Sequence, residues 1–477
     1  MRLVDEYKKL VFPSADYKFK EFVIDGVLLD LFFNETLAST NSINDLVLKR
    51  LVLLKKKDLK HLESKIPGVN IIKINKDEIM YLVNLGFLVI FNKNNLLAVE
   101  VRAYVDRGVN QAQGELSLLG PKDSFNENYN TNVALLRRRI KTSDFKILSF
   151  EIGRISKTKI GICYIEGIVK DELVLEIENK LKKIDIDGII DISYLKNTIE
   201  IHNNFLPSVM ITERPDKVSM ALLEGKVGIM ADLSPYMLIV PSFFTDFFHT
   251  VDDYYQKSSN VTFSRLLRLL AFFIAIFIPG IYLAITTRNY NLVPLDLLYV
   301  LMAGRSFVPF PAYIEALILI FAFEILKESD IRMSSVTGSA VSILGGLILG
   351  DAAVSAGIVS PIMIIVIAIS SIAGLVFNSL ELVNTTRIYK ILILLLGAFL
   401  GIYGVFLGFI FILYNICSMK IFNIPYFSPI IPFIKDDILD SFILKNKKYK
   451  TRNPLISKNK NRGRYTWGWL YIYVLLF

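Results

Sequence analysis

The stretch "GRSFVPFPAYIEALILIFAFEILKESDIR", residues 304–332, places Glu315 and Glu324 in a run that is otherwise almost entirely apolar. In a membrane, an ionised side chain is costly unless it faces protein, water or an ion, so two such acids indicate a functional interior. In a soluble core, the same acids would only be paired structural groups. The composition of the whole chain decides between these interpretations.

The chain is too apolar for an ordinary soluble protein of its length. Of its 477 residues, 53% are hydrophobic and only 21% are charged, and its mean hydropathy is +0.46. The charges are concentrated in residues 1–265, while residues 266–434 carry few. We therefore predict a large polar region followed by a membrane domain. The first twenty residues have no apolar signal core, which predicts a cytosolic N-terminus.

The few cysteines and histidines argue against a disulfide scaffold and a metal site. Cys163 and Cys417 are far apart in the sequence, as expected in a reducing compartment. The three histidines are His61, His202 and His249, too few for a His-rich metal centre. No Gly-rich phosphate loop, nucleophile elbow or zinc spacing is found. We expect no enzyme activity and no cofactor.

The net charge of +9 has its densest source near the C-terminus. Residues 445–464 hold nine Lys or Arg and no acid, directly after the last apolar region. Such a stretch is typical of the cytoplasmic side of a membrane rather than of nucleic-acid binding. With both termini inside, the number of crossings is even. The last residues, "GRYTWGWLYIYVLLF", are either an interfacial anchor or a reading-frame scar without function.

Three apolar runs are each about as long as the roughly 20 residues that a spanning helix needs. They are residues 266–287, 360–380 and 391–417. Three further runs are short, or are interrupted by Pro, Gly or acids: residues 290–304, 311–326 and 336–359. Irregular backbone at membrane depth is tolerated where protein or water covers it, so we expect short, broken or re-entrant helices here.

The polar half shows alternating strand and helix patterns in residues 18–103 and 145–192. The predicted fold class is an α/β cytosolic N-terminal region, made of two small α/β subdomains, followed by an α-helical polytopic membrane domain. Four regions follow from this: residues 1–107, 108–258, 259–420 with four to six helical segments, and 421–477. Within the second region, a short helix is predicted from Pro215 to a left-handed cap at Gly225.

The two acids of the opening stretch are nine residues apart, which is 900° of helix rotation. They therefore lie on opposite faces of a straight helix and do not share one pore. Glu324 has Lys327 and Glu328 nearby for local pairing and is interpreted as structural. Asp351 is a third acid at membrane depth. Our hypothesis is that Glu315 and Asp351 line an aqueous path shared by several copies of the chain, which would favour cations.

Other charged residues are candidates for contacts between subunits. Glu213 and Arg214 precede the helix at Pro215 and are either scaffolding or a subunit contact. Arg137, Arg138 and Arg139 follow one another in a helix that Thr131 or Asn132 is expected to cap, so they fan around its axis. They are either a solvated or headgroup-facing surface or an intersubunit ring of ion pairs.

Residues 240–257, "VPSFFTDFFHTVDDYYQK", interleave aromatic residues with acids just before the first apolar run. This pattern fits a helix at the membrane interface that connects the soluble part to the bundle. It fits an aromatic cluster of the soluble core equally well.

Three blocks, residues 114–147, 211–257 and 310–361, resemble the A subunit of GerA-type spore germination receptors, in the order in which that family has them. The likeness extends from about residue 20 to Pro454. Departures from the family pattern are Lys226, Leu233, Met333 and Ser334.

The resemblance implies a multi-pass subunit in the inner membrane of a bacterial endospore. Its implied partners are a transporter-like B subunit that binds the nutrient, a lipoprotein C subunit and further copies of itself. It implies conduction of cations or passage of a signal when germinant binds. The alternative is a secondary transporter, which would normally show two related halves.

Overall fold

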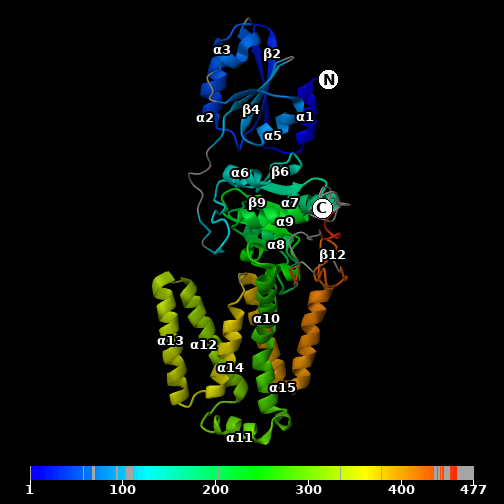
Figure 1. The fold of residues 1–477 in the computed structure, drawn as a ribbon. Helices are drawn as coiled ribbons and strands as arrows, with labels where there is room; N and C mark the ends of the chain where they lie inside the picture. Colours follow the sequence, from blue (N-terminus) through cyan, green and yellow to red (C-terminus); the bar gives the residue numbers. More distant parts are fainter. Residues whose placement is uncertain are drawn as a thin grey trace, which may run out of the picture.

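The computed structural model describes residues 2–458 except 57, 67–69, 93–94, 104–110, 113, 116, 202–203, 333–334, 378, 435–437, 439–440, 442 and 445–451, and it describes no side chains for 60, 61, 64, 95 and 330–344. The basic stretch predicted at 445–464 and the apolar end of the chain lie mostly outside these residues. Figure 1 shows an elongated molecule in which a first α/β unit, a second α/β unit and a helix bundle follow one another along the long axis.

The first unit is a three-layer sandwich around an antiparallel sheet with strand order β1-β2-β4-β5-β3. Side chains alternate between its two faces: Leu88 and Ile90 pack on one side, and Phe87 and Val89 on the other. The strands are β1 (Tyr17–Ile24), β2 (Val27–Asn34), β3 (Ile71–Lys73), β4 (Phe87–Asn92) and β5 (Asn95–Glu100), and the helices are α1 (Leu3–Val11), α2 (Thr40–Ser42), η1 (Ile43–Leu48), α3 (Lys49–Leu53), η2 (Asp58–His61), α4 (Leu62–Lys65), η3 (Lys76–Glu78) and α5 (Ile79–Val83).

The second unit repeats this topology, because its antiparallel sheet has strand order β6-β7-β9-β10-β8. The strands are β6 (Phe145–Ile152), β7 (Thr158–Ile165), β8 (Met210–Thr212), β9 (Val227–Ala231) and β10 (Met237–Val240), and the helices are α6 (Tyr129–Arg139), α7 (Asp171–Lys182), α8 (Ser193–Ile199) and α9 (Pro215–Glu224). The α/β character predicted for the N-terminal region is confirmed. At the end of the range 145–192, residues 187–192 form no strand and lead into α8.

Helix α9 forms as predicted for residues 215–225. Pro215 is its first residue, where a missing N–H costs nothing, and Gly225 ends it with φ +97°. Strand β9 then follows directly. By contrast, α6 begins three or four residues earlier than predicted, because Asn128, and not Thr131 or Asn132, caps it by accepting a hydrogen bond from Thr131 N.

The bundle begins after two 3₁₀ turns, η4 (Phe244–Phe248) and η5 (Val251–Tyr254). Its elements are α10 (Ser258–Thr287), η6 (Tyr290–Leu292), α11 (Leu295–Ala303), α12 (Ala312–Arg332), α13 (Ser335–Ser355), α14 (Pro361–Gly374) and α15 (Leu380–Ser418). Among the described residues, α10 and α15 are the helices that are long and apolar enough to cross a membrane.

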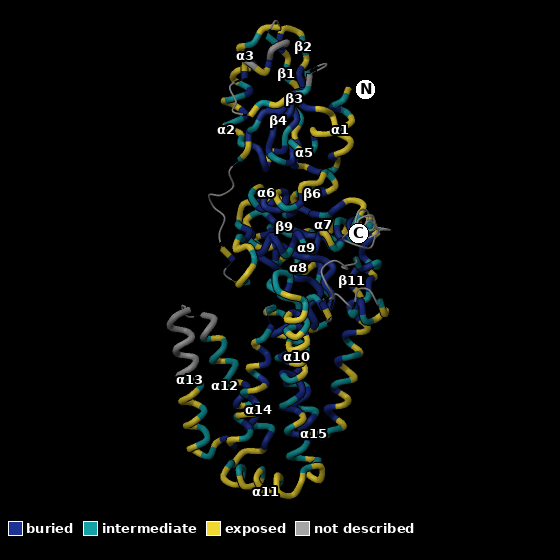
Figure 2. The backbone as a smooth tube through the Cα atoms, in the orientation of Figure 1, coloured by how far each residue is buried: buried dark blue, intermediate teal, exposed yellow. Residues whose placement is uncertain are grey.

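Three expectations about the bundle are corrected by this arrangement. Runs 311–326 and 336–359 are not broken, because α12 and α13 each continue for 21 residues despite their acids and glycines. Run 360–380 is helical over only 14 residues, in α14, and not over the whole of the predicted span. Figure 2 shows exposed residues along α11 and on parts of α12 and α13.

Residues 391–417 are not one span either, because α15 folds back on itself at Gly401. There φ is +66° and ψ is −149°, a conformation that belongs to glycine. Gly408 consequently lies against Ile393, fifteen positions away in sequence: a Cβ on Gly408 would be 2.3 Å from Ile393 Cδ1. We call residues 380–400 the first arm and residues 402–418 the second arm. Asn289, at the end of α10, secures the turn by accepting a hydrogen bond from Ile402 N at 3.0 Å.

After the second arm, the chain returns to the second α/β unit. A short hairpin of β11 (Lys420–Ile421) and β12 (Ile424–Pro425) comes first. Residues 452–458 then pack beside β7 and α7, where Lys170 N donates to Ile456 O at 3.0 Å and Lys458 N donates to Ile168 O at 2.9 Å. The second unit therefore holds chain segments from both before and after the bundle.

Candidate functional site

Glu213 and Arg214 clamp the linker that leads from the first unit to the second. Glu213 Oε1 accepts hydrogen bonds from Gly114 N at 2.6 Å and Glu115 N at 2.7 Å. Arg214 is completely buried and donates to the carbonyl oxygens of Glu115 and Pro121 at 3.1 and 2.7 Å. Both side chains thus have partners within the chain, and their role between subunits stays a prediction.

The same clamp reaches the segment that precedes α10. Asp216 receives two hydrogen bonds from the Arg214 guanidinium, at 3.1 and 2.8 Å, and a third from Tyr255 Oη at 2.9 Å. Asp252 Oδ1 accepts from Ser117 Oγ at 2.6 Å and from Leu118 N at 3.1 Å. Linker, α9 and η5 are therefore connected through charge-assisted hydrogen bonds, which are stronger than neutral ones.

Asp253 anchors the start of α10 to η5. It is 3% exposed, and its carboxylate accepts hydrogen bonds from Arg265 Nε at 3.1 Å and from both terminal nitrogens of Arg268, at 2.9 and 3.0 Å. Burial opposes ionisation of Asp253, but the bonds and charges of Arg268 and Arg265 outweigh it and lower the carboxyl pKa. The sequence pattern gave no indication of this cluster.

His249 belongs to the same junction. Its Nε2 lies 2.6 Å from the carbonyl oxygen of Ser441, which also accepts a hydrogen bond from Arg265 Nη1 at 3.3 Å. Burial, together with the nearby charge of Arg265, lowers the pKa of His249 well below its ordinary value. At neutral pH the imidazole is therefore uncharged and donates its ring proton to Ser441 O.

The aromatic residues of 240–257 form a buried cluster between the second unit and the bundle. Phe243, Phe244, Phe247 and Phe248 are each at most 4% exposed. Phe248 packs edge to face against Phe272 of α10 with a centroid distance of 5.7 Å. Of the two interpretations offered for this segment, the structure supports the core cluster, and that core joins the soluble and helical parts.

A second connection joins the second unit to the start of α15. The Lys196 ammonium forms an ion pair with Glu381, and Thr385 Oγ1 donates to Phe205 O at 2.6 Å. Both contacts lie in the first turns of the first arm. Because α10 and α15 also pack closely, with a Cβ on Gly397 only 2.4 Å from Gly280 O, the two connections act on one rigid pair of helices.

Glu315 is completely buried near the far end of the bundle, away from the α/β units. Its Oε1 accepts hydrogen bonds from Ser360 N and Ser360 Oγ, both at 2.6 Å, and its Oε2 lies 3.7 Å from Arg305 Nε. The first turn of α12 is thus bound to the N-cap of α14. Neither Ser360 nor Arg305 was singled out from the sequence, because their contacts with Glu315 are long-range.

Glu324 pairs with another helix rather than locally. Its Oε2 lies 2.6 Å from Arg387 Nη2 in the first arm of α15, so the pairing expected with Lys327 is corrected. Asp351 is exposed on α13, and no hydrogen bond or ion pair joins it to another residue that the structure describes. The proposal that Glu315 and Asp351 line one aqueous path stays a prediction. Asp351 is exposed whereas Glu315 is completely buried, so Asp351 is better placed to face such a path.

The three consecutive arginines of α6 have different surroundings. Arg137 is completely buried, and its Nε and Nη2 donate to Asp16 of the first unit at 2.8 and 3.0 Å. Its guanidinium lies between the rings of Tyr17 and Phe145. Arg138 is exposed, and Arg139 pairs with Asp123. Within one chain, Arg137 therefore holds the two α/β units together.

No metal-binding group was found in the part of the chain that the structure describes. Clusters of three or more His, Cys, Asp or Glu side chains with suitable geometry do not occur among these residues. The charged groups described above form hydrogen bonds and ion pairs between elements.

Proteins of known sequence resemble this chain over most of its length. The model of the family described as Bacillus/Clostridium GerA spore germination protein matches residues 5–456. Spore germination protein KA of Bacillus subtilis (strain 168) is 35% identical over 92% of this chain and 83% of that protein. Spore germination protein GerQA of Bacillus cereus is 30% identical over 96% of this chain and 93% of that protein.

Two further matches concern a membrane protein and a solved structure. The uncharacterized membrane protein YfkQ of Bacillus subtilis (strain 168) is 34% identical over 75% of this chain and 70% of that protein. The crystal structure of the N-terminal domain of the A subunit of the Bacillus megaterium spore germinant receptor GerK3 is 28% identical, with a TM-score of 0.38, over 50% of this chain and 94% of that one.

Proposed function

The chain belongs to the GerA spore germination protein family, and from this premise we propose that it is a membrane subunit of a nutrient-responsive germination receptor. The resemblance drawn from its three sequence blocks is confirmed. We propose that it works with a transporter-like B subunit, which binds the germinant, and a lipoprotein C subunit. Its place would be the inner membrane of the endospore.

In the membrane, we propose that the bundle makes six helical passes within the described part of the chain. These are α10, α12, α13, α14 and the two arms of α15, with α11 lying across the end that is far from the α/β units (Figure 1). An even number of passes leaves both α/β units and residues 452–458 on one side. The basic stretch after residue 444 supports the cytosol as that side.

The observation that carries the proposed role is the double connection between the second unit and the bundle. Asp253 holds α10 through Arg265 and Arg268, and Lys196 holds α15 through Glu381. A change in either partner subunit that moves the second unit would therefore move the α10–α15 pair. Such coupling requires that germinant binding favours one arrangement over the other.

We further propose that several copies assemble and conduct cations past the α12–α13 hairpin. Large apolar side chains on this hairpin are exposed, including Phe321 at 70%, Leu347 at 70% and Ile348 at 63%. Lipid or neighbouring copies have to cover them. The exposed carboxylate of Asp351 lies on the same helix as Leu347, and an acid at such a position marks an ion path.

The test measures ion flux and germination with substitutions at the two acids. Asp351→Asn should abolish or strongly reduce the release of monovalent cations after germinant addition, while the amount of receptor stays unchanged. Glu315→Gln should instead lower receptor amount, because Glu315 binds two helices together. If Asp351→Asn left cation release unchanged in spores with normal receptor levels, the proposed path would be wrong.

Liposomes that contain the purified receptor distinguish conduction from carrier transport. Passive current that does not saturate with one solute supports a channel. Saturable flux of a single solute would contradict the proposal and support a secondary transporter.

A further inference from the structure

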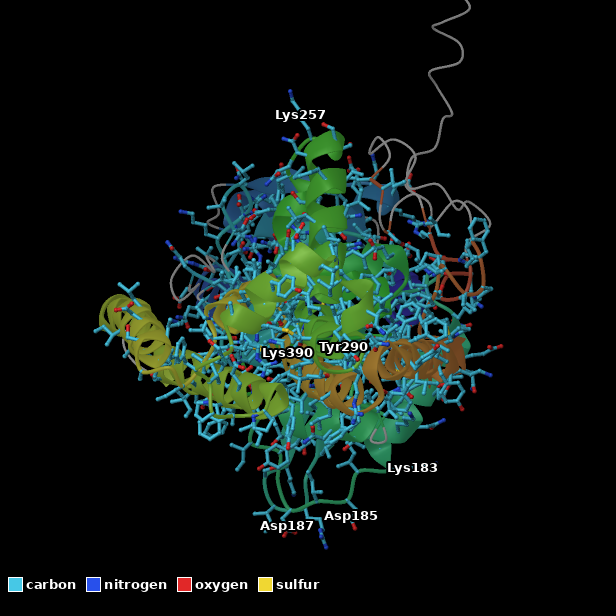
Figure 3. The ribbon with its side chains drawn as sticks, turned by 90° about the horizontal axis from the view of Figure 1, so that it is seen from below. Lys183, Asp185, Asp187, Lys257, Tyr290 and Lys390 are labelled. Carbon is cyan, nitrogen blue, oxygen red and sulfur yellow. The ribbon has the colours of Figure 1, made fainter. Side chains whose placement is uncertain are left out.

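Lys390 is a cation buried inside the helix bundle. It lies in the first arm of α15, is 5% exposed, and appears near the middle of the helix bundle in Figure 3. No hydrogen bond or ion pair joins its ammonium group to any residue in the described ranges. An isolated buried ammonium is expensive, whereas one that contacts an anion is stabilised.

The Lys390 side chain lines a cavity of about 200 Å³ between α12, α13, α14 and the first arm of α15. Among the described residues that line this cavity, the charged ones are Glu324, Lys327, Arg387 and Lys390. Three cations therefore face one carboxylate. Glu324 lies closest to Arg387, with its Oε2 2.6 Å from Nη2, and its single negative charge is shared among the three cations.

Arg387 offers a further donor to the same cavity. Its Nε is buried and has no hydrogen-bond partner, although its Nη2 contacts Glu324. A buried donor without a partner is rare in proteins and indicates a missing acceptor. With the two ammonium groups of Lys327 and Lys390, the cavity thus presents several donors and a formal charge of +2.

The remaining walls leave room for a compact group. Gly374 and Gly346 line the cavity, and a Cβ on Gly374 would meet no heavy atom within 4 Å. Phe323 and Leu375 supply apolar surface beside the charges. A cavity of about 200 Å³ with basic groups on one side and apolar groups on the other suits a small oxyanion, or an oxyanion attached to an apolar group, better than a large solute.

We propose that this cavity binds a phosphate group, either in the headgroup of an anionic lipid or as free phosphate. Phosphate carries one to two negative charges and several acceptor oxygens, which match the donors of Lys327, Arg387 and Lys390. The residues of α15 that line the cavity run from Val383 to Lys390, so they lie within about 15 Å of the end of α15 near the second α/β unit, and Gly374 ends α14 at the same side. Basic pockets between helices on the cytoplasmic side of a membrane are typical binding sites for lipid headgroups.

Binding of phosphate would fasten α12 to α14 and α15. α12 already contacts α15 through the Glu324–Arg387 pair and through the rings of Tyr313 and Phe399, whose centroids are 5.8 Å apart. An anion held by Lys327 on α12 and by Arg387 and Lys390 on α15 would add a further link near Glu324. The occupied cavity would therefore hold the α12–α13 hairpin against the bundle.

The experiment uses the purified full-length chain in neutral detergent or in phosphatidylcholine nanodiscs. One arm titrates inorganic phosphate, and the other adds phosphatidylglycerol to the nanodiscs, with thermal unfolding and direct ligand binding as readouts. We expect Lys390→Met to weaken binding about tenfold or more, because the anion loses one charge-assisted hydrogen bond and one positive charge. Lys390→Arg should retain binding, and Lys420→Met, which changes an exposed lysine after the second arm, should leave it unchanged.

The outcomes separate the two sources and can overturn the proposal. Binding of phosphatidylglycerol without binding of inorganic phosphate assigns the site to a lipid headgroup, and binding of inorganic phosphate assigns it to the free ion. The proposal is wrong if the wild-type chain binds neither, or if Lys390→Met binds as well as Lys420→Met. Should Lys390→Met fail to fold, the wild-type titrations and Lys390→Arg still decide.

Discussion

Replacement of Gly401 by alanine tests whether α15 is a hairpin. The backbone at Gly401 has φ +66° and ψ −149°, which costs any other residue about 1–3 kcal/mol. An alanine Cβ would also lie 2.3 Å from Asn289 Oδ1, so Asn289 would have to release Ile402 N. Loss of that hydrogen bond adds about 1 kcal/mol.

Together these effects predict that Gly401→Ala destabilises the bundle by about 2–4 kcal/mol. For a unit of this size, this corresponds to a decrease in Tm of roughly 5–15 °C, measured by circular dichroism in detergent. Gly350→Ala is the matched control, because a Cβ there meets no heavy atom within 4 Å and alanine favours a helix. An unchanged Tm for Gly401→Ala, or an equal decrease for Gly350→Ala, would refute the reasoning.

Thiol labelling tests the direction of the second arm independently. Cys417 is exposed and Cys163 is buried, so a membrane-impermeant thiol reagent reports mainly on Cys417. In oriented vesicles we expect Cys417 to react on the side that carries the α/β units. Labelling only from the opposite side would show that residues 391–417 cross the membrane once. A Cys163→Ser variant controls for the second thiol.

Three further predictions concern the α/β units and their junction with the bundle. Asp253→Asn should reduce stability by about 3–5 kcal/mol in thermal unfolding, because two arginines lose a buried partner, whereas Asn at the exposed Asp296 should have no effect. The fold lowers the pKa of His249, so near pH 6.5 the unfolded chain binds a proton that the folded chain excludes. Tm should therefore fall between pH 7 and pH 5, and it should fall less in His249→Gln. An equal decrease of Tm with pH in both proteins would contradict this. Arg137→Met should loosen the first unit and speed limited proteolysis of the linker, while Arg138→Met should not; equal cleavage rates would argue against the Arg137–Asp16 contact.

Local chemistry made part of the fold predictable. The first residue of α9 is a proline and its left-handed end is a glycine, and these two residues by themselves determine where the helix begins and ends. Both ends of this helix were therefore predicted. The strands of the first sheet, together with β6 and β7, fall in the two ranges whose alternating patterns predicted strands, whereas β8 and β10 were not predicted. The repeated strand order was not predicted, because pairing between distant strands leaves no local signal.

The turn at Gly401 was missed for a related reason. Apolar composition cannot distinguish one long helix from two packed arms, and Gly401 is one of several glycines between residues 397 and 408. The partners of the charged candidates were missed as well, because they are distant in sequence: Arg137 pairs with Asp16, and Glu315 pairs with Ser360. Helix periodicity did predict that Glu315 and Glu324 face different neighbours, and they do.

The return of residues 452–458 to the second α/β unit has a consequence for biogenesis. Val169 and Ser457 form an isolated antiparallel β-bridge, so the bundle is an insertion within the sequence of this unit. A ribosome must synthesise every helix of the bundle before the unit receives its last segment. We therefore expect the unit to mature only after the helices have entered the lipid, so that a chain whose insertion fails exposes an incomplete domain to proteolysis.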